Sequence, residues 1–337
     1  MRICIVGAGA IGGLMGASFA LGGDDVTVID RGSQLAAILD NGLTVVAKDG
    51  TARVARNLRA TGDFDAAGQH DLVVLALKAQ VIASVAPQIP KLFGPGTMLL
   101  TAQNGLPWWY FQRHGGPHEG QRIQCLDPEG TIASAIDPQR IIGCVVYPAA
   151  EITSPGVIHH VEGDRFAIGE LDGISSERLK TMADAFARAG FKANAVDDIR
   201  AEIWLKLWGN MSFNPISALT HATLVDICQF PATRELAGAM MREAQAIAGK
   251  LGIEFRLPLE KRIAGAEKVG KHKTSTLQDV EAGREIETDA LLGSVIELAH
   301  LTQTPAPVCE SVHALLTLLA REMRVGHAAS RLVKLAA

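Results

Sequence analysis

One segment of the chain carries three polar side chains that could act together on a small molecule. Within residues 199–219, Lys206, Asn210 and Asn214 recur at intervals of four. On a helix these side chains share one face, which drifts slowly around the axis. The rest of the segment is mostly apolar, so this polar face needs partners or a ligand. A lysine that reaches solvent beside two asparagines in a helix–helix contact fits the pattern equally well.

A second candidate site lies near the start of the sequence, where glycines follow a short apolar run. Three glycines form a G-x-G-x-x-G motif that gives a tight turn, a close backbone approach to a pyrophosphate and close packing of a helix on a strand. The amino end of that helix would face the anionic pyrophosphate with its N–H groups and dipole. A glycine-rich turn without a ligand is the plain alternative. The motif predicts a dinucleotide site formed by Gly7, Gly9, Ala10, Ile11 and Gly12.

The end of the second predicted strand bears on the choice of dinucleotide and gives mixed signals. Asp30 lies eighteen residues beyond Gly12 and could accept a hydrogen bond from a ribose 2′-hydroxyl, which favours NAD(H). Arg31 could instead pair with a 2′-phosphate, which favours NADP(H). The residues themselves leave this choice open.

Two later positions also follow predicted strands. Lys78 comes directly after one apolar strand, and Asn104-Gly105 follows the next. Ligands of parallel sheets bind beyond the carboxyl ends of the strands, so both positions are placed for contact with the cofactor. An exposed lysine and an ordinary turn dipeptide are the alternatives.

The elements that must hold these residues change character near residue 197. Before it, apolar strands are separated by helical stretches such as 12–21, which predicts a parallel sheet with helices on both faces. The later strands could include antiparallel members of the same sheet. The predicted strands are 2–6, 25–29, 71–77, 97–101, 141–146, 156–160, 165–168 and 191–196.

After residue 197 the strand signals stop and helical apolar spacing takes over. We therefore expect an α/β fold with a Rossmann dinucleotide-binding domain over residues 1–197 and an all-helical domain over 198–337. The predicted helices are 199–219, 232–251, 259–269, 276–300 and 308–323.

Over essentially its whole length the chain resembles the ketopantoate reductase (2-dehydropantoate 2-reductase) family. This resemblance implies a 6-phosphogluconate-dehydrogenase-like fold and NADPH-dependent reduction of ketopantoate to pantoate, a step toward pantothenate and coenzyme A. The blocks at 200–220 and 274–287 are its most specific parts. The matching segments are GAGAIGG (7–13), Arg31-Gly32, Leu77-Lys78, Asn104-Gly105, RAEIWLKLWGNMSFNPISALT (200–220) and TSTLQDVEAGREIE (274–287).

The resemblance implies roles for the polar helix face and for the second block. Lys206 would be the catalytic acid, and Asn210, Asn214, Ser275 and Glu287 would hold the substrate. Hydride transfer to a ketone carbon leaves charge on its oxygen, which a lysine ammonium can polarise and then protonate. Partial burial would lower the pKa of that lysine toward working pH. Without the resemblance, Ser275 could be only a helix cap and Glu287 only an exposed helix charge.

On the cofactor side, the resemblance places Asn104 near the nicotinamide and the substrate. It places Lys78 beside the dinucleotide and Arg31 at the 2′-phosphate, so NADP(H) is the favoured cofactor. NAD(H) stays open because Asp30 stands where a neutral residue is expected.

The sequence departs from the family pattern after Asn104. Residues 106–110 (LPWWY) form a bulky aromatic patch, which could line the mouth of the substrate site or simply pack under the following segment. That segment, 114–139, is polar, rich in glycine and proline, and predicted to be a long surface loop. A related hydroxy-acid dehydrogenase acting on another 2-keto or 3-keto acid is therefore the main alternative function. A dinucleotide-sensing protein without turnover is the third.

Composition excludes several other classes. The formal net charge of −4 gives no basic excess of the kind that a nucleic-acid surface needs. The five cysteines are widely spaced without a C-x-x-C pair, so we expect no disulfide framework, no metal site and a reducing, cytoplasmic location. Residues 3–23 are uncharged but contain seven glycines, which suits a strand and helix better than a membrane anchor. The apolar helices after residue 197 could also pair two copies of the chain.

Overall fold

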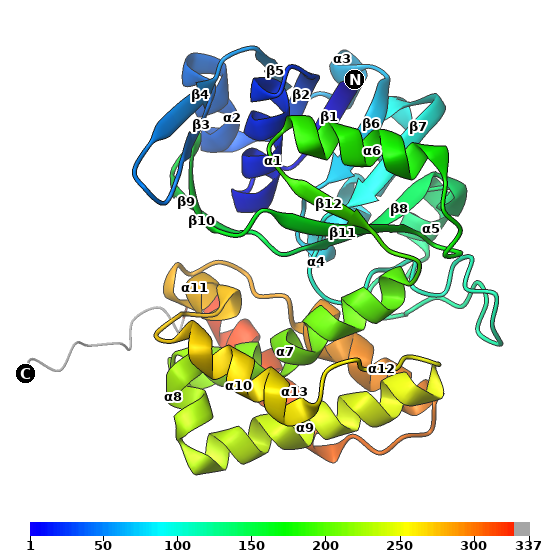
Figure 1. The fold of residues 1–337 in the computed structure, drawn as a ribbon, viewed down its shortest axis with the longest axis vertical. Coiled ribbons are helices and arrows are strands. Elements are labelled where there is room, and N and C mark those ends of the chain that lie inside the picture. Colours follow the sequence, from blue (N-terminus) through cyan, green and yellow to red (C-terminus); the bar gives the residue numbers. More distant parts are fainter. Residues whose placement is uncertain (327–337) are drawn as a thin grey trace, which may run out of the picture. The chain divides into compact units, whose positions relative to one another are not determined.

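The structure, a computed structural model, describes residues 1–326, and its chain divides into two compact units (Figure 1). The first unit comprises Met1–Arg122 and Asp127–Glu202, and the second comprises Ile123–Leu126 and the chain from Ile203 onward. The first unit is α/β, and the described part of the second is built from helices. The fold class expected from the sequence is thus confirmed. Residues 327–337 of the predicted helical domain lie outside the described residues.

An eight-stranded sheet forms the centre of the first unit, in the order β12-β11-β8-β7-β6-β1-β2-β5. Neighbouring strands are parallel except for β8 and β11, which run antiparallel. The strands are rich in buried β-branched residues, as strands covered on both faces require. Their bounds are β1 Arg2–Val6, β2 Asp25–Ile29, β5 Leu58–Thr61, β6 His70–Leu75, β7 Phe93–Thr101, β8 Ile141–Val146, β11 Arg165–Glu170 and β12 Lys192–Ala195.

A second sheet of four strands, in the order β4-β3-β10-β9, joins two distant parts of the sequence (Figure 1). The prediction that 156–160 belongs to the main sheet is wrong, because this segment forms β10 and pairs with β3 and β9. The sequence pattern also missed β3, β4, β5 and β9. Most residues of β4 and β9 are exposed, so they lack the apolar alternation that marks a strand. The bounds are β3 Leu43–Val46, β4 Ala52–Ala55, β9 Ala149–Ser154 and β10 Val157–Glu162.

Helices α1 and α6 pack on one face of the main sheet through a shared apolar cluster. The rings of Phe19 on α1 and Phe186 on α6 meet edge to face, with centroids 5.2 Å apart. The remaining helices of this unit are short. The bounds are α1 Ala10–Leu21, α2 Gly32–Asn41, α3 Phe64–Ala67, α4 Ala79–Val85, η1 Ala86–Leu92, α5 Thr131–Ala135, η2 Pro138–Arg140 and α6 Glu177–Arg188.

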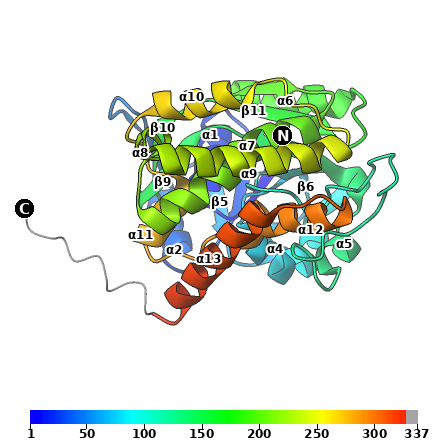
Figure 2. The same ribbon diagram turned by 90° about the horizontal axis from the view of Figure 1, so that it is seen from below.

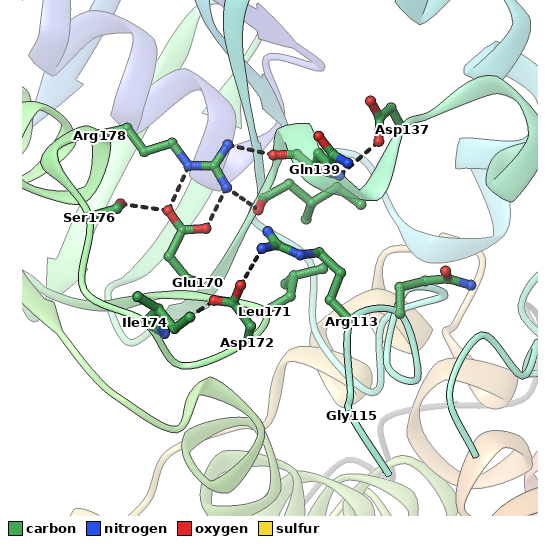
Figure 3. A network of polar contacts seen from close by, with 12 residues as sticks. Arg113, Gly115, Asp137, Gln139, Glu170, Leu171, Asp172, Ile174, Ser176 and Arg178 are labelled. Atoms are coloured by element: carbon green, nitrogen blue, oxygen red, sulfur yellow. Dashed lines mark hydrogen bonds and ion pairs between the residues drawn. The ribbon is translucent and has the colours of Figure 1, made fainter. Parts of the chain in front are cut away.

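A buried ion pair fastens the start of α6 to the end of β11 (Figure 3). The Glu170 carboxylate accepts hydrogen bonds from Arg178 Nε and from Ser176 Oγ, each at 2.6 Å. Arg178 also donates to the Gln139 carbonyl at 2.5 Å, which ties α6 to the segment before β8. The Glu170 side chain is only 4% exposed, so these bonds replace the water that its charge would otherwise need.

The second unit is centred on α9, which contacts α8, α10, α12 and α13 (Figure 2). Helix α7 begins in the first unit and continues through the second. None of the helices within residues 1–326 has the length and apolar character needed to cross a membrane. The bounds are α7 Ile199–Thr220, α8 Leu224–Gln229, α9 Pro231–Lys250, α10 Leu259–Val269, α11 Ser275–Glu281, the π-helical turn η3 Asp289–Gly293, α12 Ser294–Leu301 and α13 Pro307–Arg324.

The prediction of one helix over residues 276–300 is wrong. Helix α11 ends at Glu281, and regular structure resumes only near the π-helical turn that leads into α12. Gly283 has a φ of +65°, and the Arg284 N–H bonds to the Asp279 carbonyl at 2.8 Å. This pattern is a glycine-terminated helix end, whose left-handed residue stops the helix at little steric cost.

Candidate functional site

The glycine motif forms a loop whose three glycines have distinct steric reasons to lack a side chain. Gly7 has a φ of +94°, and a Cβ on Gly12 would lie 1.8 Å from the Gly7 carbonyl oxygen. A Cβ on Gly9, by contrast, would have no atom within 4 Å. Gly7 and Gly12 therefore allow α1 to pack closely on the turn, whereas Gly9 borders open space. That space is what a backbone approaching a pyrophosphate requires.

The amino end of α1 is arranged to accept a negative charge. Its N-cap residue is Gly9, no side chain caps it, and no acidic residue lies in its first turn. The first N–H groups of a helix have no partner within the helix, and its dipole favours an anion. The backbone of Ala10, Ile11 and Gly12 thus fits the phosphates of a dinucleotide.

Asp30 is bonded to the backbone of this loop. Its Oδ2 accepts from the Ala8 N–H at 2.6 Å, and its Oδ1 accepts from the Arg31 N–H at 2.7 Å. Each oxygen keeps a lone pair for a further donor. Arg31 is the exposed N-cap residue of α2, so its guanidinium can meet a ligand beside the end of β2.

Gln34 is a residue of this region that sequence reasoning missed. Its Nε2 donates to the Ala8 carbonyl at 2.6 Å, and its Oε1 accepts from the Gly156 N–H at 3.0 Å. Gln34 thereby connects the glycine loop to the turn that precedes β10. The one signal in the sequence is a polar residue in the first turn of the helix after the second strand, which alone predicts no such contact.

Two predicted residues follow neighbouring strands of the sheet. Lys78 is the N-cap residue of α4 just after β6, and Asn104 follows β7. Leu75 of β6 is in register with Thr101 of β7, so these strands end at the same level. Both side chains are half-buried. The main sheet therefore brings the two positions to the edge where the glycine loop also lies.

The aromatic patch after Asn104 is part of the core of the first unit. Trp108, Trp109 and Tyr110 are 3%, 1% and 0% exposed. Trp109 Nε1 donates to Thr101 Oγ1 at 3.0 Å, and its ring fills the space that a Cβ on Gly143 would need. This burial favours plain packing over a role at the mouth of a substrate site.

The prediction that 114–139 is a long surface loop is only partly right, because most of the segment is turns and bends but two short helices interrupt it. The segment contains α5 and η2, and Asp127 is buried, with its carboxylate accepting the N–H groups of Ile132 and Ala133 at 3.0 and 2.9 Å. Part of it belongs to the second unit, where the Gln124 and Cys125 N–H groups bond to the carboxylate of Glu297 on α12. Side-chain acceptors thus order a segment that its glycine and proline content marks as a loop.

The start of α7 is held inside the first unit by a buried arginine. Arg200 is 8% exposed and donates to the carbonyls of Tyr110 at 2.7 Å, Gln112 at 2.8 Å and Leu171. Burial lowers the pKa of Arg200 from its usual value. The three carbonyl dipoles take the place of water around the guanidinium.

Further along α7, two tryptophans anchor the helix in the second unit. Trp204 and Trp208 are fully buried, and Trp208 Nε1 donates to the Met241 carbonyl of α9 at 2.7 Å. The ring of Phe255 lies 4.3 Å from that of Trp208, centroid to centroid. This packing fixes the rotation of α7 and therefore the direction of its polar face.

The polar face of α7 is formed as the four-residue spacing predicts. Lys206 and Asn210 are half-buried, and Asn214 is buried at 6% exposure. Asn214 Nδ2 lies 3.5 Å from Ser275 Oγ on α11, so two predicted substrate residues from distant parts of the sequence come together.

Ser275 and Glu287 do not have the simple structural roles considered from the sequence. The cap of α11 is Thr274, whose Oγ1 accepts from the Leu277 N–H at 3.2 Å, while Ser275 is exposed. Glu287 is half-buried and lies in the irregular segment just before the π-helical turn, not on a helix surface. Turns of this kind often occur at functional sites.

Comparison with known proteins covers both units. The family model described as ketopantoate reductase PanE/ApbA matches residues 3–173, and that for the C terminal part of the same family matches residues 198–320. A 2-dehydropantoate 2-reductase of Mesorhizobium japonicum is 50% identical over 323 residues, which span 96% of this chain and 98% of that protein.

Solved structures agree with these matches. A Ralstonia solanacearum MolK2 protein, described as a candidate ketopantoate reductase, is 42% identical with a TM-score of 0.91, over 95% of this chain and 98% of its own. The 2-dehydropantoate 2-reductase of Geobacter metallireducens GS-15 is 27% identical with a TM-score of 0.83, over 94% and 99% of the two chains. The chain therefore belongs to the ketopantoate reductase family.

Proposed function

We propose that this protein reduces ketopantoate to pantoate with NADPH, as a 2-dehydropantoate 2-reductase. The observation that carries the proposal is the 50% identity to a relative of that name across nearly the whole of both chains. The polar face of α7 supports it, because Lys206, Asn210 and Asn214 are the residue types that a keto-acid site needs.

Lys206 is the proton donor in this proposal. The reduced nicotinamide supplies a hydride to the ketone carbon of the substrate. The Lys206 ammonium polarises the ketone oxygen and then gives it a proton, so the products are a 2-hydroxy acid and the oxidised dinucleotide. The half-buried position of the lysine strengthens its interaction with the developing charge, since less water screens it.

The other polar residues of the second unit orient the substrate. The amide groups of Asn210 and Asn214 and the exposed hydroxyl of Ser275 can donate to the substrate carboxylate and ketone. Glu287 can accept from the hydroxyl of ketopantoate. Together these groups distinguish a hydroxylated keto acid from a plain one, because only the hydroxylated acid can donate to the Glu287 carboxylate.

NADP(H) is the proposed cofactor. Arg31 is exposed beside the end of β2, where a 2′-phosphate would need a cation. The two bonds of Asp30 to backbone N–H groups offset part of its negative charge, which would otherwise repel a 2′-phosphate beside it. Lys78 and Asn104 would contact the dinucleotide from the ends of β6 and β7.

The test is a comparison of substrates with the purified protein. Oxidation of NADPH and of NADH is followed with ketopantoate and with a panel of 2-keto and 3-keto acids. We expect the highest kcat/KM for ketopantoate with NADPH. A higher value for another keto acid would identify a related dehydrogenase, and dinucleotide binding without turnover on any acid would identify a sensing protein.

A further inference from the structure

A polar atom without a partner lies at the carboxyl edge of the main sheet. Gln103 follows β7 and immediately precedes Asn104, and its Oε1 is buried without a hydrogen-bond partner. Leaving a buried acceptor unpaired costs about 1–3 kcal/mol. Native proteins rarely keep such a group unless a ligand, a water or a functional constraint accounts for it.

Gln103 Oε1 differs in its location from the other buried side-chain atoms that lack a hydrogen bond. Among the described residues, six side chains have one buried nitrogen or oxygen atom without a hydrogen bond, and other atoms of some of these side chains do have partners, such as Oδ1 of Asp24. Asp24 precedes β2 and His70 begins β6, so both lie at the opposite, amino edge of the sheet, and Thr27 is in the middle of β2. His114 and Arg122 belong to the segment after the aromatic patch. Gln103 alone of these six stands where a parallel sheet binds its ligand.

The strand order indicates which half of a dinucleotide would lie near Gln103. The glycine loop follows β1, and Asp30 and Arg31 follow β2, so the adenosine half belongs on the β1–β2 side. Strands β6 and β7 lie on the other side of β1. The end of β7 therefore serves the nicotinamide half, whose carboxamide and ribose carry N–H and O–H donors.

We propose that Gln103 is a cofactor-binding residue that accepts a hydrogen bond from the nicotinamide half of the dinucleotide. The residue as a whole is only half-buried, and rotation about its last torsion exchanges Oε1 and Nε2. The amide can therefore turn toward a bound ligand and relieve the unpaired acceptor. This inference rests on the proposed function, because it requires that the protein binds a nicotinamide dinucleotide.

The test uses Gln103→Met, which keeps the size of the side chain and removes the acceptor. Calorimetry measures its affinity for NADPH and for 2′,5′-ADP, which lacks the nicotinamide half. We expect NADPH binding to weaken about tenfold, the loss of one well-made hydrogen bond. Binding of 2′,5′-ADP should be unchanged, and the thermal midpoint of the ligand-free protein should be equal or higher.

Thr27→Val is the matched control, because it removes another buried unpaired acceptor with little change of shape. It should leave both affinities unchanged. Gln103→Glu keeps an acceptor and is expected to bind NADP⁺ within about threefold of the wild type. Gln103→Leu also removes the acceptor and should weaken NADPH binding about tenfold, so it provides a second measurement if the methionine variant does not fold.

Several outcomes would overturn the inference. Unchanged NADPH affinity in Gln103→Met would mean that Gln103 bonds only to water. An equal loss for NADPH and 2′,5′-ADP would mean that the substitution disturbs the whole loop. If the wild type binds no dinucleotide, both this inference and the proposed function fail. If it binds NADPH but reduces no keto acid, only the proposed function fails, and the affinities still decide the role of Gln103.

Discussion

The glycine loop in the first unit and the polar face of α7 in the second are built from different parts of the chain. The loop offers backbone N–H groups. It requires glycine at position 12, since a Cβ there would overlap a carbonyl oxygen. The face of α7 offers side chains, and its direction depends on packing by two buried tryptophans. A backbone site limits residue type strictly, whereas a side-chain site on a helix tolerates many sequences.

This difference explains why the glycine loop could be predicted from the residues alone, whereas the function of the polar face of α7 could not. The G-x-G-x-x-G spacing between a strand and a helix has few other uses. Lys206, Asn210 and Asn214 at helical spacing could equally be a helix–helix contact, and only the family resemblance favoured catalysis.

Replacing Lys206 should give the largest difference between an effect on turnover and an effect on dinucleotide binding. Lys206→Met removes the proposed proton donor, so kcat should fall by about 10²–10⁴-fold. The Kd for NADPH should change little, because the dinucleotide site belongs to the first unit. Lys261→Met, which removes an exposed lysine on α10, is the control and should be neutral in both assays. Loss of NADPH affinity in the Lys206 variant would show that the two sites are not separable.

Two glycine substitutions test whether Gly9 and Gly12 have different steric roles in the loop. Gly9→Ala puts a methyl group into open space, so the fold should remain stable while NADPH binding weakens about tenfold or more. Gly12→Ala must push α1 away from its turn, so it should lower stability by about 1–3 kcal/mol and abolish binding. Urea unfolding and calorimetry measure both effects. Equal stability losses at the two positions would contradict the steric distinction between them.

Much of the fold could be predicted because apolar runs directly indicate buried parallel strands. Of the strands that escaped prediction, β4 and β9 are mostly exposed, and β3 and β5 have only four residues each. The segment of β10 was assigned to the wrong sheet because a periodic pattern does not specify its partner. The break in the predicted helix 276–300 depends on a single residue, Gly283, whose left-handed conformation is a property of the folded chain.

Those parts of the candidate site that depend on residue type could be predicted from the sequence. Those that depend on contacts between distant segments could not. The bonds of Gln34 to Ala8 and Gly156 join segments that are distant in sequence, and no local pattern signals them. The sequence gives Asp30 a place beside the ribose, and it gives no sign of the two backbone N–H groups that the Asp30 carboxylate accepts. The roles of individual site residues toward substrate and cofactor stay predictions.

Away from both sites, the Glu170–Arg178 pair should control acid stability of the first unit. Burial of the carboxyl tends to raise its pKa, but hydrogen bonds from Arg178 and Ser176 outweigh it and hold the pKa of Glu170 below its ordinary value. A lowered carboxyl pKa contributes stability that is complete above the ordinary value, about 4.3, and is lost as pH falls through the folded value.

Glu170→Gln should therefore lower the free energy of unfolding by about 2–4 kcal/mol at pH 7, because it leaves a partly buried guanidinium without its counter-charge. Urea unfolding from pH 7 to pH 3 should show this difference shrinking at the acid end. Glu177→Gln, at an exposed ion pair on the same helix, should have no measurable effect. A difference that persists undiminished at pH 3 would assign the effect to packing and not to charge.

The smallest expected effect concerns the preference of the protein for NADPH over NADH, which lacks the 2′-phosphate. Asp30→Asn removes a negative charge near the proposed place of the 2′-phosphate, so the ratio of kcat/KM for NADPH to that for NADH should rise about threefold to tenfold. Damage to the Ala8 and Arg31 hydrogen bonds affects both dinucleotides and cancels in the ratio. Arg31→Ala should move the ratio the opposite way, and added salt should weaken both changes.

If Asp30→Asn instead raises the ratio only by impairing NADH, with NADPH unchanged at every salt concentration, then Asp30 bonds to the ribose hydroxyl. In that case the carboxylate serves NAD(H) directly, and its two backbone bonds position it for that contact.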